Sequence, residues 1–417
     1  MRSRSHMPAA FASLTSFASM ALAGSVLCIL AATPVHADQV DELIKQLASP
    51  HVSIRSDAAE ALVHVKNKRA IPALLIASGD TVESVRGQAL RALATTADKT
   101  SVPLLLTTLA DKSSAYRRAG AATLLGIIGD KNASTGLAAA TKDQNMLVRS
   151  AATEALGTLG DARAADAVQP LLNDVNPRVR LKAVIAVGRM RDRRSVNSLI
   201  TLLHDKRHEV QSASALALAT IGDRSALPAL TAIMRSTKSS TPFGMRFYAA
   251  YALGALGDKT AAPTLIEGLN DKDKYVRSTA AGALGMLRET SAVMPLSQSL
   301  LHDKFSLTRF EAAQTLGKLH DKRAVGPLIK GLKDISEDVR EQSAKALGRI
   351  GDKSAVPALI ASFHDSDEAI PKAAVLALGH IGDKSALPAV RLLLKHKDAT
   401  VRQAASDVVA MLDQKPK

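Results

Sequence analysis

Apolar residues recur along this chain at the spacing of short amphipathic helices, and the same pattern returns every 31 or 32 residues. Residues 352–382 show one unit clearly. Val356, Leu359 and Ile360 lie on one stripe of a first helix, and a turn follows at Asp365. A second apolar stripe after this turn predicts a second helix. Each unit is therefore expected to be a helical hairpin, here called an A helix followed by a B helix.

An arginine column marks the repeat most clearly. It consists of Arg55, Arg86, Arg118, Arg149, Arg180, Arg246, Arg277, Arg309, Arg340 and Arg402, with Gln211 and Pro371 in the two vacant positions of the register. Twelve copies of the unit fill residues 38–417. Self-similarity at this period is typical of a solenoid, in which each unit buries its apolar face against its neighbours. We expect an all-α fold, an α–α superhelix of about twelve two-helix repeats.

The junctions between units carry helix stop and start signals. Gly351 can adopt the left-handed conformation that ends a helix, and Asp352 can accept the free N–H groups of the next one. Pro357 lies near the first turn of the A helix, where a missing N–H costs least.

The turn aspartate, the Val-Arg that opens the B helix six residues later and the Gly-Asp junction resemble HEAT repeats. They look most like the bacterial type called PBS-lyase HEAT-like repeats, and the resemblance covers residues 38–417. It implies a ladder between adjacent units, built from turn aspartates and B-helix arginines. The expected pairs are Asp143 with Arg149, Asp174 with Arg180, Asp271 with Arg277, and Asp334 with Arg340. This role is structural, so we expect no catalysis from the repeated residues.

The first 37 residues differ from the rest of the chain. Arg2 and Arg4 precede an apolar stretch over about 14–32, and Val35-His36-Ala37 ends it. Basic, apolar and then small-x-small is the pattern of a secretory signal peptide, here cleaved after Ala37; a retained membrane anchor is the alternative. We expect a periplasmic or secreted mature chain, residues 38–417, without a transmembrane segment.

Charge adds a second hypothesis about partners. Removal of Arg2 and Arg4 lowers the 54 basic residues to 52, against 39 acidic ones, so the mature net charge is +13. Much of the excess falls in residues 178–207, at Arg178, Arg180, Lys182, Arg189, Arg191, Arg193, Arg194, Lys206 and Arg207. This segment either is a solvated face or binds an anionic envelope polymer or membrane surface. We expect no nucleic-acid partner.

Aromatic residues gather where the repeat breaks its own pattern. The step from Gln211 to Arg246 is 35 residues, which indicates an insertion in one A–B turn. Aromatic side chains follow it, and we assign a partner-binding role to Phe243, Phe247, Tyr248, Tyr251, Tyr275 and Phe310. Phe247 and Phe310 directly follow the column arginine, a position expected to face the concave groove. The alternative is that the cluster fills an irregular core.

No motif for catalysis or metal binding stands out, and we expect no cofactor. Similar repeats occur in deoxyhypusine hydroxylase, which holds iron through several His-Glu pairs at the starts of B helices. The single His208-Glu209 pair here falls before the B helix, so that chemistry does not carry over. Phycobilin lyase subunits share the repeat but act on a cytosolic pigment. An enzyme of either type remains the weakest alternative.

These observations favour an exported, non-enzymatic scaffold that binds another protein or peptide through its concave groove. Binding of an anionic polymer or membrane through residues 178–207 is the second hypothesis.

Overall fold

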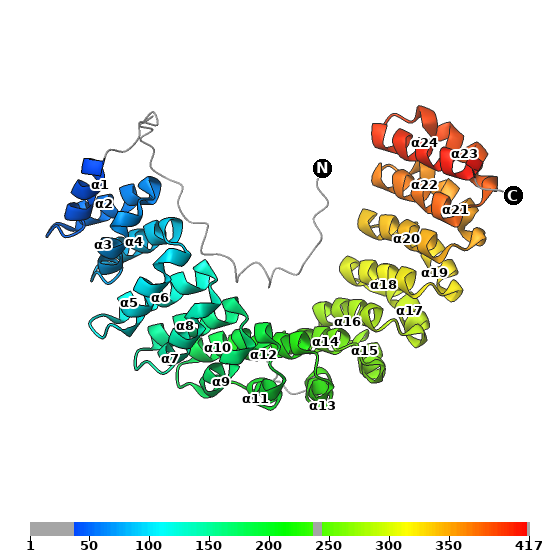
Figure 1. The fold of residues 1–417 in the computed structure, drawn as a ribbon. Helices are drawn as coiled ribbons and strands as arrows, with labels where there is room; N and C mark the ends of the chain where they lie inside the picture. The colour runs from blue at the N-terminus through cyan, green and yellow to red at the C-terminus, as the bar shows by residue number, and fades with distance from the viewer. Residues whose placement is uncertain (1–36, 237–243, 415–417) are drawn as a thin grey trace.

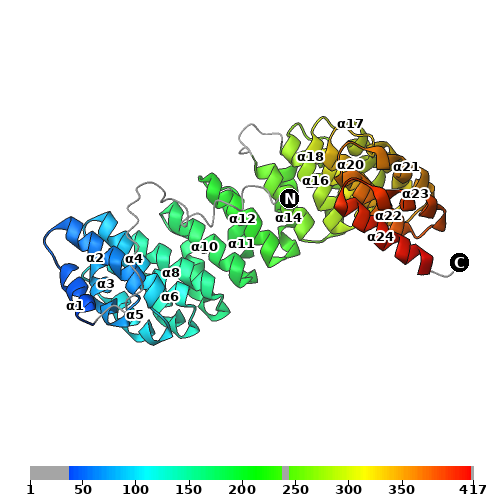
Figure 2. The same cartoon turned by 90° about the horizontal axis from the view of Figure 1, so that it is seen from above.

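The computed structural model describes residues 37–236 and 244–414. The expected leader lies outside these residues except for Ala37, which begins the first helix, and Phe243 lies outside them as well. The described chain forms helical hairpins stacked in single file into an open arc, with the two ends of the arc far apart (Figure 1). Seen from above, the hairpins follow one another along the arc without a second layer (Figure 2).

Twelve helix pairs make up the described chain, as the arginine column predicts. The A helices are α1 (Ala37–Gln46), α3 (Ile71–Ala77), α5 (Val102–Ala110), α7 (Ser134–Ala140), α9 (Ala165–Val168), α11 (Val196–Leu202), α13 (Leu227–Met234), α15 (Ala262–Gly268), α17 (Val293–His302), α19 (Val325–Gly331), α21 (Val356–Ala361) and α23 (Leu387–Leu392). The B helices are α2 (Val52–Val65), α4 (Glu83–Thr96), α6 (Ala115–Ile128), α8 (Met146–Leu159), α10 (Pro177–Met190), α12 (His208–Ile221), α14 (Met245–Ala255), α16 (Lys274–Leu287), α18 (Ser306–Leu319), α20 (Glu337–Ile350), α22 (Ala369–Ile381) and α24 (Ala399–Gln414). B helices line the concave side of the arc and A helices the convex side (Figure 1).

The junction chemistry confirms the stop and start signals of the sequence. Gly351 has φ 76° and ends α20 in the left-handed conformation. Asp352 then accepts a hydrogen bond from the N–H of Ser354 at 3.0 Å and caps a short 3-10 turn that leads into α21. Four non-glycine residues take the same left-handed position in other units, namely Lys66, Arg191, Arg288 and His320.

Close packing between neighbouring B helices depends on a glycine column eight residues after the column arginine. At Gly348 in α20, an added Cβ would lie 2.7 Å from the Cα of Ala377 in α22. Gly126, Gly157, Gly254 and Gly317 meet an alanine of the next B helix in the same way, at 2.6–2.9 Å. The core is therefore a thin layer of Ala, Leu and Val, in which backbones nearly touch.

Three B-helix junctions lack the glycine of this packing. Val63 and Ala92 stand in the facing positions between α2 and α4, Ala94 and Leu124 between α4 and α6, and Ala219 and Ala252 between α12 and α14. The last two pairs of helices are the least closely packed B-helix neighbours among the described residues, whereas α2 and α4 pack closely despite Val63. Loss of the glycine alone therefore does not separate two B helices.

We expect Gly348→Ala to lower the free energy of unfolding by about 1–3 kcal/mol, the usual cost of overpacking. The new methyl group would press on the backbone of Ala377, which cannot rotate away. Gly326→Ala is the matched control, because no atom lies within 4 Å of its added Cβ. Chemical denaturation of both variants measures the difference, and equal stabilities would show that the helices separate freely.

Candidate interaction surface

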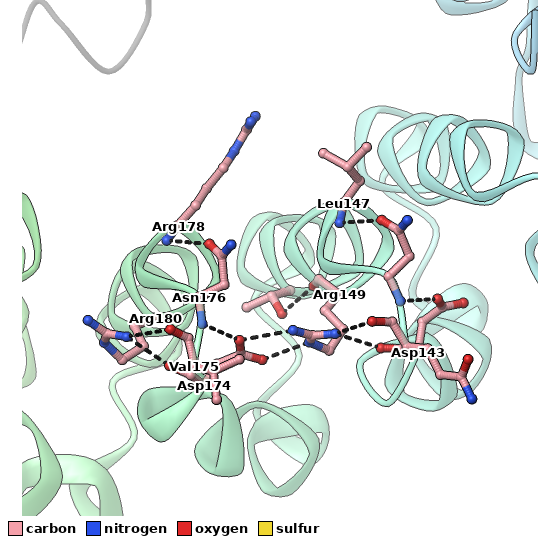
Figure 3. A network of polar contacts seen from close by, with 11 residues as sticks. Asp143, Leu147, Arg149, Asp174, Val175, Asn176, Arg178 and Arg180 are labelled. Atoms are coloured by element: carbon pink, nitrogen blue, oxygen red, sulfur yellow. Dashed lines mark hydrogen bonds and ion pairs between the residues drawn. The ribbon is translucent and has the colours of Figure 1, made fainter. Parts of the chain in front are cut away.

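The ladder is built from both the backbone and the side chain of each turn aspartate. Nε of Arg149 donates to Oδ2 of Asp174 at 2.7 Å, and Nη2 donates to Oδ1 at 3.0 Å. Nη1 donates to the backbone carbonyl oxygens of Asp143 at 2.9 Å and Gln144 at 2.8 Å (Figure 3). The guanidinium therefore ties its own turn to the turn of the next unit.

This geometry corrects the pairing inferred from the sequence. Asp143, Asp174, Asp271 and Asp334 offer only their backbone carbonyls to Arg149, Arg180, Arg277 and Arg340, respectively. Each carboxylate instead binds the arginine of the preceding unit. The ion pairs are Arg55–Asp80, Arg118–Asp143, Arg149–Asp174, Arg180–Asp205, Arg246–Asp271, Arg277–Asp303, Arg309–Asp334 and Arg340–Asp365. The intra-unit carboxylate pairing was wrong because the turn directs its carbonyls, not its carboxylate, toward its own B helix.

The ladder lowers the pKa of its carboxylates. Hydrogen bonds from Arg55 are the main cause that lowers the pKa of Asp80 below its ordinary value of 3.8. At Asp174, burial alone would raise the pKa, but hydrogen bonds from Arg149 and the N–H of Asn176 outweigh it. A depressed folded-state pKa stabilises the protein above the unfolded pKa. The stabilisation is lost as the pH falls through the folded pKa.

Where a ladder arginine is missing, the acidic partner is missing too. Gln211 would face position 236 of the next unit, which is serine, and Pro371 would face position 396, which is histidine. The ladder also lacks an ion pair at Arg86, for a different reason. The guanidinium of Arg86 lies 4.1 Å from the ring centre of Tyr116, while Asp111 binds Arg117.

The concave surface is formed by one stripe of each B helix. On α16, Tyr275, Thr279, Gly282 and Met286 are half-buried or exposed, and they lie at the spacing of one helix face. This stripe is the exposed face of α16, and the B helices line the inner side of the arc (Figure 1), so we place the stripe on the concave surface.

Aromatic side chains reach this stripe on α14 and α16. Tyr251 is half-buried and occupies the position equivalent to Gly282, while Tyr275 is 45% exposed. The ring of Tyr275 packs edge-to-face against Phe305, with centroids 5.6 Å apart. The ammonium group of Lys274 lies 5.1 Å and 4.8 Å from these two ring centres. We call Tyr251, Tyr275, Phe305 and Met286 the aromatic surface.

The other described members of the expected cluster contact the core. Phe247, Tyr248 and Phe310 are half-buried and pack against the core, and Phe247 meets Tyr248 edge-to-face at 5.1 Å. Burial at the position after the column arginine differs between units, since Ser150 and Ser278 are only 4% exposed there whereas Lys372 and Gln403 are exposed. Phe247 and Phe310 contact the core, and their expected role in partner binding stays a prediction.

Three residues in or beside the aromatic surface had no predicted role. Met286 is 50% exposed on the inner stripe of α16, and Phe305 packs on Tyr275. Glu311 of α18 leans over Gly282, with a carboxylate oxygen 3.1 Å from the position of an added Cβ. Burial raises the pKa of Glu311. Alignment of all repeats on the arginine column, followed by reading of the positions at −2, +2, +5 and +9, could have found Met286 and Glu311.

The basic segment 178–207 is divided among different faces. Arg180 is a ladder residue, and Arg178 points away from the ladder (Figure 3). The other contacts are Lys182–Glu154, Arg189–Thr158, Arg193–Asp223, Arg194–Asp166 and Arg207–Glu209. Arg191 ends α10 at one flank of the solenoid, while Lys206 lies in a turn at the other. These nine residues do not form one continuous cationic patch.

Residues 37–236 and 244–414 contain no helix that is long and apolar enough to cross a membrane. They also contain no group of three or more His, Cys, Asp or Glu side chains arranged to hold a metal ion.

The repeat geometry and the sequence agree on the family. The model of HEAT repeats matches residues 40–126, 108–176, 168–242, 238–317, 293–370 and 359–417. The chain belongs to the HEAT-repeat family. A comparison with curated proteins finds no match.

Solved structures support the same fold. The structure of Kap95p with RanGDP has a TM-score of 0.58 at 15% identity, and importin beta has a TM-score of 0.54 at 16% identity. The matches cover 90% and 89% of this chain, respectively, but only 61% of each of those chains. Human deoxyhypusine hydroxylase is 24% identical over 60% of this chain and 96% of its own length, and its TM-score of 0.28 is too low to carry an argument.

Proposed function

We propose that this protein is an exported, non-enzymatic scaffold that binds another protein through the aromatic surface in its concave groove. The observation that carries the proposal is the exposure of Tyr275 and Met286 on the inner stripe of α16. Repeated residues of the unit have structural roles, in the ladder, the caps or the core. Tyr275 and Met286 are not residues of the repeated pattern, and their side chains belong neither to the ladder nor to a cap nor to the core.

Exposed aromatic residues in a concave surface are a common form of protein anchor. Tyr and Trp contribute much of the binding energy at interfaces because they bury a large area with little loss of side-chain entropy. Lys274 and Glu311 border the aromatic surface with opposite charges, which can orient a polar partner. Kap95p, a solenoid of similar fold, is described in its complex with RanGDP.

The proposal is tested by site-specific photo-crosslinking in cells. We expect a crosslinkable amino acid at Tyr275 to give a discrete adduct in the envelope fraction. The same amino acid at Met294, which is 52% exposed on the convex helix α17, should give none. Mass spectrometry then identifies the partner. Equal adducts at both positions, or none at Tyr275, would contradict binding in the groove.

A further inference from the structure

The carboxylate of Glu311 in α18 lacks a partner among the described residues. Its side chain is half-buried, and it forms neither a hydrogen bond nor an ion pair with any residue of 37–236 or 244–414. The other buried or half-buried acidic side chains in these ranges all accept hydrogen bonds or pair with a base, as Asp334 does with Arg309. A carboxylate removed from water without a counter-charge is unfavourable, so Glu311 is a candidate for a contact with another molecule.

This carboxylate stands in the inner stripe of the groove. One of its oxygens lies 3.1 Å from the position of a Cβ added to Gly282. Gly282 is five residues after the column arginine, and the other eleven units have a residue with a side chain at that position. The equivalent residues of the neighbouring units are Tyr251 and Gln314. The carboxylate of Glu311 therefore takes a place in the row that a side chain of α16 would otherwise hold.

Members of the aromatic surface lie around Gly282. A Cβ added to Gly254 of α14 would lie 2.6 Å from the Cβ of Ala283 in α16, which fixes the height of one helix against the other. Tyr251 therefore lies within about 3 Å of Gly282 along the helix axes, at 1.5 Å per residue. Tyr275 lies two turns before Gly282 on the same face of α16. A segment that covers the aromatic surface would thus also cover this carboxylate.

The nearby lysines do not neutralise Glu311. The ammonium group of Lys274 lies against the rings of Tyr275 and Phe305. Lys318, in the same helix as Glu311, donates a hydrogen bond to Gln314 at 2.6 Å. Burial raises the pKa of Glu311 more than the charge of Lys318 lowers it. Both lysines are exposed and remain hydrated, so only the carboxylate requires a charge from outside.

We propose that the partner held in the groove presents a basic side chain, arginine or lysine, that pairs with Glu311 beside Tyr251 and Met286. This inference rests on the proposed function and names the chemistry of the anchor. The charged head would bind the carboxylate, while the aliphatic stem would cover the exposed thioether of Met286. The ring of Tyr251 offers a further favourable contact for a cation. An apolar or acidic anchor would instead bury the carboxylate without a counter-charge, at a cost in affinity.

Fluorescence anisotropy with the purified protein tests the proposal. The probes are three labelled peptides that share a Phe-Xaa-Leu core between Gly-Ser flanks, where Xaa is Arg, Gln or Glu. We expect the wild type to bind the Arg peptide about tenfold more tightly than the Gln peptide, as for a hydrogen bond between charged groups. Glu311→Gln keeps the shape of the side chain and should abolish this preference. Glu311→Lys should reverse it in favour of the Glu peptide.

Glu60→Gln is the matched control for the change in charge. Glu60 is exposed on α2 at the position equivalent to Gly282, far along the groove from the aromatic surface. This variant should keep the preference for the Arg peptide. The proposal is overturned if the wild type does not bind the Arg peptide, or if Glu311→Gln and Glu60→Gln affect the preference equally.

Tyr275→Ser separates this inference from the proposed function. We expect it to weaken the binding of all three peptides and to leave the ratio between them unchanged. If Tyr275→Ser has no effect while Glu311→Gln abolishes the preference, the basic anchor is supported and the aromatic surface is not the binding site. If Tyr275→Ser weakens binding but the charge at Xaa makes no difference, the aromatic surface is supported and the pairing with Glu311 is overturned.

Discussion

Replacement of Arg309 by alanine is expected to lower the free energy of unfolding by about 3 kcal/mol, because it strands a carboxylate inside the ladder. The side chains of Arg309 and Asp334 are only 8% and 11% exposed, the most buried guanidinium among the ladder pairs. Two hydrogen bonds of 2.7 Å join them, and a third reaches the backbone carbonyl of Asp303 at 2.9 Å. Urea denaturation followed by circular dichroism measures the loss.

Arg86→Ala is the matched control for this variant. Arg86 makes the same kind of backbone contacts, to the carbonyls of Asp80 and Thr81, but no ion pair with the turn of the next unit. Its loss should therefore cost clearly less than the loss of Arg309. Equal destabilisation by the two variants would mean that the backbone bonds, and not the ion pairs, hold adjacent units together.

The sequence predicts the hairpins well because every unit repeats the same signals. Glycine at the helix end, aspartate at the cap and apolar residues at helical spacing act locally, and twelve copies make the period unmistakable. It predicts which residues form the ladder but not how they pair. Arg149 is six residues from Asp143 and 25 from Asp174, and only the stacking of the units shows that the second carboxylate lies closer to the guanidinium.

The direction of individual side chains is less predictable. Side chains of successive helix residues point in directions about 100° apart. A shift of one position along α14 therefore decides whether a side chain enters the groove or, like Phe247, packs against the core. The aromatic cluster was correctly located between residues 243 and 310, yet it combines core-packed and surface members. Tyr275 is exposed and Tyr251 is half-buried, while Phe247, Tyr248 and Phe310 are half-buried and pack against the core.

This division makes the groove hypothesis testable with little effect on the fold. Tyr251→Ser combined with Tyr275→Ser should leave the melting temperature nearly unchanged, because Gly282 and Ser84 already occupy the equivalent positions in other units. Affinity for the partner captured at Tyr275 should fall by about 2 kcal/mol or more, roughly 30-fold, as for other aromatic anchors.

Phe247→Ser is the comparison variant, for which we expect a lower melting temperature and unchanged affinity. Its ring packs against the core, so its loss should lower the melting temperature by creating a cavity, while the protein that stays folded should still bind. Titration calorimetry and thermal melting on both variants separate anchoring from core filling. If the tyrosine variant binds its partner as tightly as the wild type, the aromatic surface is not the anchor, and the partner must contact another part of the groove.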